Sequence, residues 1–263
     1  AMNYAILPLK YIQANPCVAV KIGKMPMDMT AKAHTEYICS AEEFNQILKR
    51  FPADNCFHLS LVVPYNTGTR IGETFAIDLS QDVDFEKHEL RIHGQMQKVE
   101  KTWYIKPPKY DSYRTIKMGE TLEKELKFAI QQRRINKLKY GGAYSKTYLL
   151  PDRSIAQIRA DIDVPYKEIL PLCVKENGAL LTPDSFKYCA RIIHYELNNP
   201  LFHAHCLRHT HGTILAENGV NPKTVMERLG HKDITTTLQT YTFNTDAMQQ
   251  TAVDVFENAI QTQ

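Results

Sequence analysis

The sequence predicts a mainly α-helical domain with a small antiparallel β-sheet, an α+β fold. Apolar residues recur at helical spacing on both sides of a central region, from about residue 40 to 64 and again from about residue 120 onward. Between Leu90 and Ile116 the apolar residues instead alternate with polar ones, which is the period of a strand. Helices that enclose one short alternating region are typical of an α+β fold.

The composition is that of a soluble globular protein. Of the 263 residues, 43% are hydrophobic and 23% are charged, and no apolar run approaches the roughly 18 residues that a membrane span needs. The formal net charge of +3 does not by itself indicate nucleic acid. Six cysteines are scattered without a CxxC pair, which argues against a disulfide framework or a zinc ribbon and favours a reducing compartment.

The helices before the alternating region have clear start and stop signals. Ser40 and Glu43 form a capping box, so a helix is expected to begin there. The segment 58–64 is apolar nearly all round, which predicts a buried helix. Thr67-Gly68 breaks this helix, and Arg70 opens another short one.

The alternating region is also basic and aromatic. Its apolar positions predict one small sheet, with residues 107–112 as a turn between two strands. Lysines, arginines and aromatic residues crowd this region: Lys98, Lys101, Trp103, Tyr104, Lys106, Lys109, Tyr110, Tyr113, Arg114 and Lys117. Such a charge run is usually a solvated face, but it is equally compatible with contact to nucleic-acid phosphates.

The second half of the chain is predicted to be helical. Helices are expected over residues 120–139, 182–197, 205–218, 222–229 and 246–260, the last as an amphipathic tail helix. Gly141-Gly142 ends the first of them, and Pro222 after Asn221 starts the fourth. Residues 143–168 have weak periodicity and are compatible with an inserted loop or with short strands.

Four segments carry charged or nucleophilic side chains in a fixed order. They are Thr67-Gly-Thr-Arg-Ile-Gly-Glu73, the Lys109 turn, His205-Cys-Leu-Arg-His-Thr210, and the stretch from Leu229-Gly-His231 to Tyr241. Each motif alone is weak, but the ordered set resembles the catalytic domain of the tyrosine recombinases, the family of phage integrases. The resemblance covers roughly residues 36–260 and is nearest to integrases of Gram-positive conjugative transposons. It implies the tyrosine recombinase catalytic domain fold.

Two arginines are the candidates for binding the reacting phosphate. Phosphodiester transfer builds negative charge on the non-bridging oxygens, and a guanidinium offers them two hydrogen bonds while it stays charged. Arg70 lies at a predicted helix start, where backbone N–H groups also favour an anion. Without the resemblance, Arg70 would be expected to form a surface ion pair with Glu73. The resemblance instead makes Glu73 a supporting residue of the site. Arg208 is the second candidate.

Two histidines accompany the arginines. His205 lies three residues before Arg208 on one helix face, so both can reach one phosphate. His231 follows Gly230 and is expected to hydrogen-bond the phosphate or to assist proton transfer; either histidine could instead pack in the interior. The His-rich stretch 203–211 could also suggest a metal, but no second His/Cys cluster completes a set of four ligands, so no metal site is predicted.

Tyr241 is the predicted nucleophile. Tyrosines usually pack in cores, and a phenol with a pKa of roughly 10 is a poor nucleophile unless positive groups favour its phenolate or a base takes its proton. Arg70, Arg208 and a neutral histidine would provide that setting. The position of Tyr241 after Gly230-His231 is where the resemblance places the nucleophile.

Lys109 is the candidate general acid for the leaving 5′ oxygen, because an alcohol leaves poorly as an alkoxide. A turn between strands can reach into the minor groove beside the cut site. Lys106 is the alternative acid. Lys106, Tyr110 and Arg114 are otherwise expected to contact DNA.

The resemblance implies a site-specific recombinase or integrase. Tyr241 attacks a DNA phosphodiester, which gives a 3′-phosphotyrosyl intermediate, and strands are exchanged through a Holliday junction to integrate or excise a mobile element. Neither ATP nor a metal nor another cofactor is implied, because the bond energy stays in the ester. The implied partners are double-stranded DNA and a homo-tetramer on two sites, with the tail helix packed on a neighbour or on its own domain. A bacterial, cytoplasmic, DNA-associated protein is expected.

Two other functions remain open from the sequence. A type IB topoisomerase would use the same residues but reseal its own strand, whereas a non-catalytic DNA-binding module would tolerate loss of Tyr241.

The resemblance also implies a division of the chain into two domains. Residues 1–34 are expected to be the last helix (near 3–14) of a truncated core-binding domain with a linker. Residues 35–263 are expected to be the catalytic domain with its tail helix.

Overall fold

The computed structural model describes residues 6, 8–16, 37–232, 250, 253 and 257. It divides the chain into two compact units, Ala1–Thr35 and Glu36–Gln263. In the first unit, residues 8–16 form turns and bends, with the Lys10 N–H donating to the Ile6 carbonyl (3.2 Å). The helix expected near 3–14 is therefore wrong for residues 8–14, where Lys10 has a positive φ (53°) that an α-helix does not allow. The predicted tail helix and Tyr241 lie outside the described residues, apart from three isolated positions of the tail.

The second unit begins with three helices, α2 (Ala41–Arg50), α3 (His58–Thr67) and α4 (Ile71–Ala76). The predicted capping box is present, since the Ser40 N–H donates to Glu43 Oε2 (2.8 Å) and the Glu43 N–H to Ser40 Oγ (3.2 Å). Nearly every residue of α3 is buried, as its apolar sequence predicted. Gly68 ends α3 in the left-handed conformation, and Arg70 caps the start of α4.

The predicted single sheet is wrong in one respect, because the region forms two sheets. β1 (Val83–Asp84), β2 (Glu89–Ile92) and β5 (Arg114–Lys117) form one, and β3 (Gln95–Val99) and β4 (Thr102–Lys106) form the other. The turn between β4 and β5 contains the short 3₁₀ helix η1 (Lys109–Asp111), in which Tyr110 and Asp111 have positive φ (62° and 53°). After this turn the chain leaves the β3–β4 hairpin, and β5 pairs with β2.

The remaining elements follow the prediction closely. They are α5 (Glu120–Tyr140), η2 (Gly141–Ala143), β6 (Ser145–Leu149), β7 (Ile155–Arg159), β8 (Lys167–Ile169), α6 (Pro183–Glu196), α7 (Ala204–Glu217) and α8 (Pro222–Leu229). Residues 143–168 therefore contain short strands, and β6 pairs with both β7 and β8. Asn221 caps α8, with Pro222 in its first turn.

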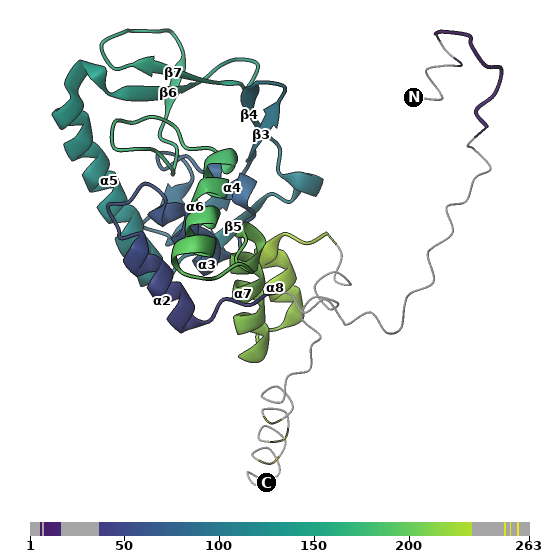
Figure 1. The fold of residues 1–263 in the computed structure, drawn as a ribbon, viewed down its shortest axis with the longest axis vertical. Coiled ribbons are helices and arrows are strands. Elements are labelled where there is room, and N and C mark those ends of the chain that lie inside the picture. Colours follow the sequence, from purple (N-terminus) through teal and green to yellow (C-terminus); the bar gives the residue numbers. More distant parts are fainter. Residues whose placement is uncertain are drawn as a thin grey trace. The chain divides into compact units, whose positions relative to one another are not determined.

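Helix α3 is central to the core of the second unit and contacts α4, α5 and α7, while α7 and α8 lie side by side (Figure 1). Leu61, Val63 and Leu207 at these contacts have no exposed surface. The C-terminal end of α3, which carries the segment 67–73, therefore lies near α7 and α8, which carry the other predicted catalytic segments. Within the described part of the chain, no helix is long and apolar enough to cross a membrane.

Candidate active site

The end of α3 provides the first fixed point of the site. Gly68 has φ +68°, and a Cβ there would lie 2.3 Å from Leu229 Cδ2 and 2.9 Å from His211 Cδ2. Both the left-handed backbone and the close packing of α7 and α8 therefore require glycine. The Gly68 carbonyl accepts a hydrogen bond from Arg208 Nη1 (2.7 Å), so this turn positions a predicted phosphate-binding arginine.

Arg70, two residues later, is held by Glu73. Arg70 Nη1 donates to Glu73 Oε1 (2.8 Å), and the Arg70 backbone N–H donates to Glu73 Oε2 (3.0 Å). Arg70 Nη2 donates to the Gly230 carbonyl (3.2 Å), 160 residues away in sequence. The expected ion pair between Arg70 and Glu73 is thus present, but it uses only one of the five N–H donors of the guanidinium. The other Arg70 side-chain donors make no bond within the described residues, and 17% of the side chain is exposed.

Glu73 is fully buried and is shared between two arginines. Besides Arg70, it accepts a bond from Arg114 Nη2 at Oε2 (2.7 Å). Burial would raise the pKa of Glu73, but the Arg114 hydrogen bond and the charges of Arg114 and Arg70 outweigh it and lower that pKa. Glu73 is therefore an anion that orients the two arginines.

His205 and Arg208 lie one turn apart on α7, as predicted. Arg208 is 3% exposed, and its charge together with that of Arg70 acts on His205. Burial first, and then these two guanidiniums, lower the pKa of His205 below its ordinary value. The imidazole is therefore neutral at physiological pH.

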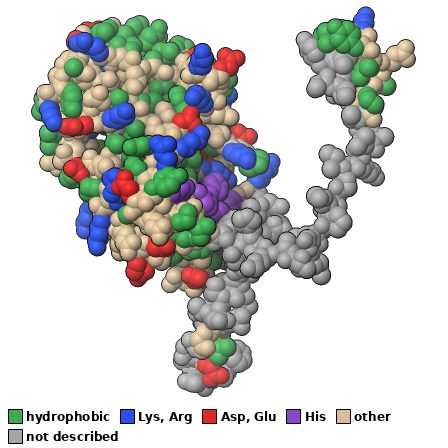
Figure 2. Space-filling view, in the orientation of Figure 1, with side chains coloured by type: hydrophobic (Ala, Val, Ile, Leu, Met, Phe, Trp, Pro, Cys, Tyr) green, Lys and Arg blue, Asp and Glu red, His purple; other side chains and the backbone are tan. Residues whose placement is uncertain are grey.

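His231 follows the end of α8. Gly230 caps α8 in the left-handed conformation (φ +69°), so the chain turns there and carries His231 away from the helix axis. Burial, followed by the charges of Arg208 and Arg70, lowers the pKa of His231 to about 4. Arg70 Nη2 bonds the Gly230 carbonyl next to His231, and Arg208 Nη1 bonds the Gly68 carbonyl two residues before Arg70. These bonds, and the charges of the same two arginines acting on both histidines, bring the four residues to one region of the protein. Figure 2 shows histidine side chains gathered in one patch next to lysine and arginine side chains.

The Lys109 turn differs from this buried cluster. Lys109 is exposed in η1, and its Nζ lies 4.9 Å from the ring centroid of Tyr110, which is itself 60% exposed. Ser112 Oγ donates to the Lys109 carbonyl (2.9 Å) and closes the turn. Lys106, the alternative acid, lies on β4, with its Nζ 5.8 Å from the ring centroid of Tyr104. Among the described residues, neither lysine forms an ion pair with Glu73, the carboxylate that holds Arg70.

Arg114 was predicted to contact DNA, but its side chain points into the protein. It is 8% exposed and donates to Glu73, to the Arg228 carbonyl from Nε (2.8 Å) and to the Ser112 carbonyl from Nη1 (3.2 Å). Arg228 has a similar role that the sequence analysis missed. It donates from Nη2 to the Asn66 carbonyl and from Nη1 to the Lys117 carbonyl (both 3.1 Å).

The predicted nucleophile, Tyr241, lies outside the described residues, which reach Lys232 before the gap.

The His-rich stretch 203–211 belongs to no metal site among the residues that the structure describes, where no group of three or more His, Cys, Asp or Glu side chains could hold a metal ion. His205 and His209 contact one another edge to face, with ring centroids 5.5 Å apart.

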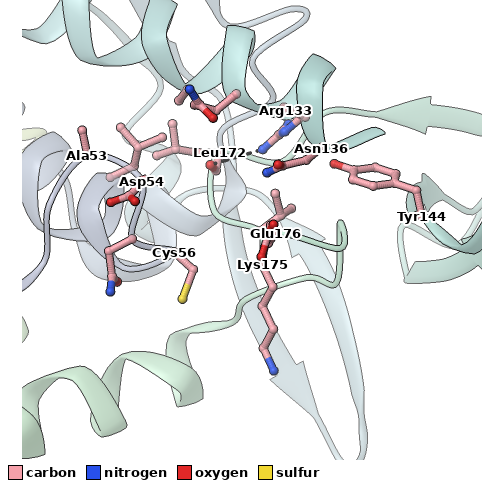
Figure 3. Close-up of a pocket in the computed structure, with 14 residues that line it drawn as sticks. Ala53, Asp54, Cys56, Arg133, Asn136, Tyr144, Leu172, Lys175 and Glu176 are labelled. Carbon is pink, nitrogen blue, oxygen red and sulfur yellow. Dashed lines mark hydrogen bonds between the residues drawn. The ribbon is translucent and has the colours of Figure 1, made fainter. Parts of the chain in front are cut away.

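A cavity of about 310 Å³ lies elsewhere in the second unit, where Arg133 and Asn136 of α5 face Tyr144 (Figure 3). Arg133 donates to the carbonyls of Pro171 and, at 3.4 Å, Leu172. Glu176 on the cavity wall is paired with Lys139 (2.5 Å). None of the predicted site residues lines this cavity, so it is not part of the candidate active site.

Relatives of known sequence match nearly the whole chain. A tyrosine recombinase XerC-like protein of Caldanaerobacter subterraneus is 27% identical over 266 residues, which is 97% of this chain and 62% of that protein. The transposase from transposon Tn916 of Enterococcus faecalis is 26% identical over 84% of this chain and 52% of that protein. The chain thus spans only about half to three fifths of the length of these relatives.

Solved structures share the fold. The Tn1549 transposon integrase, in complex with a circular intermediate DNA, matches with a TM-score of 0.64 at 21% identity, over 96% of this chain and 74% of that chain. XerA recombinase matches with a TM-score of 0.52 at 18% identity, over 85% of this chain and 66% of that one. The predicted tyrosine recombinase catalytic domain fold is confirmed. A family model described as the phage integrase family matches residues 39–248, and the chain belongs to that family.

Proposed function

We propose that this chain is the strand-cleaving part of a site-specific DNA recombinase, in which Tyr241 attacks a DNA phosphodiester and forms a 3′-phosphotyrosyl intermediate. The observation that carries the proposal is the convergence of Arg70, Arg208, His205 and His231. The two arginines lie on segments far apart in sequence, yet both lower the pKa of both histidines. Such a site combines fixed positive charge with neutral imidazoles.

The charge balance of the cluster suits a phosphate. The guanidiniums of Arg70 and Arg114 pair with the carboxylate of Glu73, and Arg208 binds the Gly68 carbonyl instead, so these four groups carry a net charge of two positive units. Arg70 and Arg208 bind the non-bridging oxygens, where negative charge develops during transfer. Glu73 supports Arg70 and does not react.

The neutral histidines complete the proposed chemistry. An imidazole that is unprotonated at neutral pH can accept the phenolic proton of Tyr241 or hydrogen-bond the phosphate. Lys109 protonates the leaving 5′ oxygen, with Lys106 as the alternative, and Tyr110 contacts DNA. The 5′ hydroxyl of a partner strand then reverses the step without ATP or a metal cofactor.

The wider activity belongs to the same proposal. The matched Tn1549 integrase structures contain transposon-end or circular intermediate DNA, and double-stranded recombination sites are the proposed partner of this chain. Four protomers on two sites exchange strands through a Holliday junction to integrate or excise a mobile element, with the tail helix 246–260 packed on a neighbour. Residues 1–34 end a core-binding domain, and the protein acts on DNA in the bacterial cytoplasm.

Covalent trapping tests the proposal without knowledge of the target sequence. The chain is incubated with nicked duplexes randomised around the nick, so that the short strand diffuses away after cleavage and the adduct accumulates. Adducts that survive denaturation are recovered, and their DNA is sequenced and resynthesised as the defined substrate. Tyr241→Phe should abolish the adduct, while Tyr195→Phe, which changes an exposed tyrosine on α6, should keep it.

Two outcomes would contradict the proposal. An adduct formed by Tyr241→Phe would mean that another residue is the nucleophile. Relaxation of a supercoiled plasmid that carries the recovered sequence, without any exchange between two such sites, would favour a type IB topoisomerase activity.

A further inference from the structure

Arg114 makes an unusual set of contacts for a residue in a basic, aromatic region. Its guanidinium donates to three acceptors, Glu73 Oε2 (2.7 Å), the Arg228 carbonyl (2.8 Å) and the Ser112 carbonyl (3.2 Å). Only 8% of its side chain is exposed. A side chain committed to the interior in this way has little surface left for a DNA phosphate.

The three acceptors lie on three different segments of the proposed active site. Glu73 holds Arg70 through both carboxylate oxygens. Ser112 closes the turn of Lys109 through its hydroxyl. The Arg228 carbonyl lies at the last turn of α8, from which the chain passes directly to Gly230 and His231.

Gly230 packs directly on the Arg114 guanidinium. A Cβ at position 230 would lie 2.7 Å from Arg114 Nη1 and 3.0 Å from Cζ, and the residue has φ +69°. The Gly230 carbonyl in turn accepts a bond from Arg70 Nη2 (3.2 Å). The peptide that precedes His231 is therefore fixed by Arg114 on one side and by Arg70 on the other, and Glu73 joins these two arginines.

We propose that Arg114 is a positioning residue that sets Arg70, His231 and the Lys109 turn relative to one another, and that it does not bind DNA. This inference rests on the proposed recombinase function. Without Arg114, Glu73 pairs with Arg70 alone and draws that guanidinium back from the phosphate. The Gly230-His231 turn at the same time loses the group on which it packs.

The test compares Arg114→Gln and Arg114→Lys with a control, Arg91→Gln, which changes an exposed arginine on the neighbouring strand β2. The single-turnover cleavage rate on the defined nicked duplex should fall about 10²-fold in Arg114→Gln, as expected for misplaced reacting groups. DNA affinity should change less than about threefold, and the salt dependence of binding should stay the same. Arg114→Lys should recover little of the rate, because one ammonium cannot make three divergent bonds in a plane.

A double-mutant cycle with Glu73 distinguishes a positioning role from a general structural one. If Arg114 acts through Glu73, the double variant Glu73→Gln/Arg114→Gln should cleave no more slowly than the slower of the two single variants. Multiplying defects would mean that Arg114 acts elsewhere. A phosphate contact would instead lower the affinity of Arg114→Gln as much as its cleavage rate and make the salt slope shallower by about 0.9. Either result would overturn the inference.

Hydrogen exchange on the free protein separates this inference from the proposed function. Backbone amides in residues 109–114 and 228–232 should exchange faster in both Arg114 variants than in Arg91→Gln, whether or not the wild type cleaves DNA. Unchanged exchange there would reject the positioning role. Failure of the wild-type chain to form any adduct, with faster exchange in the variants, would reject the recombinase function and leave the structural coupling in place.

Discussion

The two sides of the candidate site are built differently. On one side, Arg208 and Glu73 are 3% and 1% exposed, and each makes hydrogen bonds to the protein that fix its side chain. On the other side, Lys109 lies on an exposed turn and is followed by Tyr110 and Tyr113, which are 60% and 56% exposed. The fold itself fixes the arginine side, whereas the lysine side is an exposed turn held by its own closure and by one bond from Arg114 to the Ser112 carbonyl.

This difference matches the proposed chemistry of each side. The non-bridging oxygens of any phosphodiester have the same geometry, so the groups that bind them gain from being fixed in advance. The leaving 5′ oxygen belongs to a strand that must depart and later be replaced. A lysine on an exposed turn can follow that exchange, and contact with DNA would order it.

The largest expected effect tests the fixed side. Arg208→Lys and Arg70→Lys keep the charge but lose the planar two-bond geometry, so the single-turnover cleavage rate should fall about 10²- to 10³-fold. DNA affinity, measured on the same duplex at fixed salt concentration, should change far less. Equal losses of rate and affinity in both variants would mean that these arginines only hold the DNA backbone.

A smaller effect concerns the stability of the fixed side at acid pH. His211 Nδ1 donates to the Tyr65 carbonyl (2.9 Å), and its Nε2 accepts from Arg228 Nε (2.9 Å), so a proton on Nε2 would break the second bond. Burial and the charge of Arg228 lower the pKa of His211 to about 4. The unfolded chain, with an ordinary pKa of roughly 6.5, therefore binds more protons between these two values.

The sign of the pH effect follows from this difference. The contribution of His211 to the free energy of unfolding is fully present above pH 6.5 and is lost as the pH falls toward 4. It amounts to a few kcal/mol, roughly 3 for a shift of this size. Urea unfolding at several pH values should show a shallower decline in His211→Gln than in the wild type. Parallel curves for the two proteins would contradict the assignment.

The smallest effect is expected on the exposed side. Ser112→Ala removes the hydroxyl that closes the Lys109 turn, an exposed hydrogen bond worth about 1 kcal/mol or less. Cleavage should slow less than about fivefold, and the melting temperature should stay within a degree or two of the wild-type value. A loss of rate as large as that of Arg208→Lys would mean that the turn is as rigidly fixed as the arginine side, and the comparison would fail.

Much of the fold was predictable because its helix ends depend on local signals. The capping box at Ser40, the left-handed Gly68 and the Asn221-Pro222 start each act within one helical turn, and each is present in the structure. The division into two sheets was not predictable, because it depends on β5 pairing with β2 across the intervening β3–β4 hairpin, and no local pattern reveals that pairing.

The strands of residues 143–168 failed to show a period of two for a physical reason. Thr147 and Tyr148 are consecutive on β6 and are both buried, so both faces of this strand are covered and its sequence does not alternate. A strand with one buried face would have alternated.

The predicted site residues came from short motifs, and the structure gathers four of the six proposed catalytic residues around one place. The orientation of Arg114 was missed, although the sequence holds a clue. Arg114 lies two residues before the buried Ile116 on the same strand, so both face inward. Its partner Glu73 lies 41 residues away, and no local pattern reveals that pairing.

The most direct test of the central claim is to change the bridging atom of the substrate. The 5′ oxygen of the defined duplex is replaced by sulfur, which leaves readily without a proton because thiols are far more acidic than alcohols. On ordinary DNA, Lys109→Ala should cleave about 10²- to 10⁴-fold slower than the wild type. On the sulfur substrate this defect should nearly vanish, whereas the defect of Arg208→Ala should persist, because its proposed partners are the non-bridging oxygens. Rescue of Lys106→Ala instead would assign the acid to that lysine, and rescue of Arg208→Ala, or of neither lysine variant, would contradict the division of roles between the two sides.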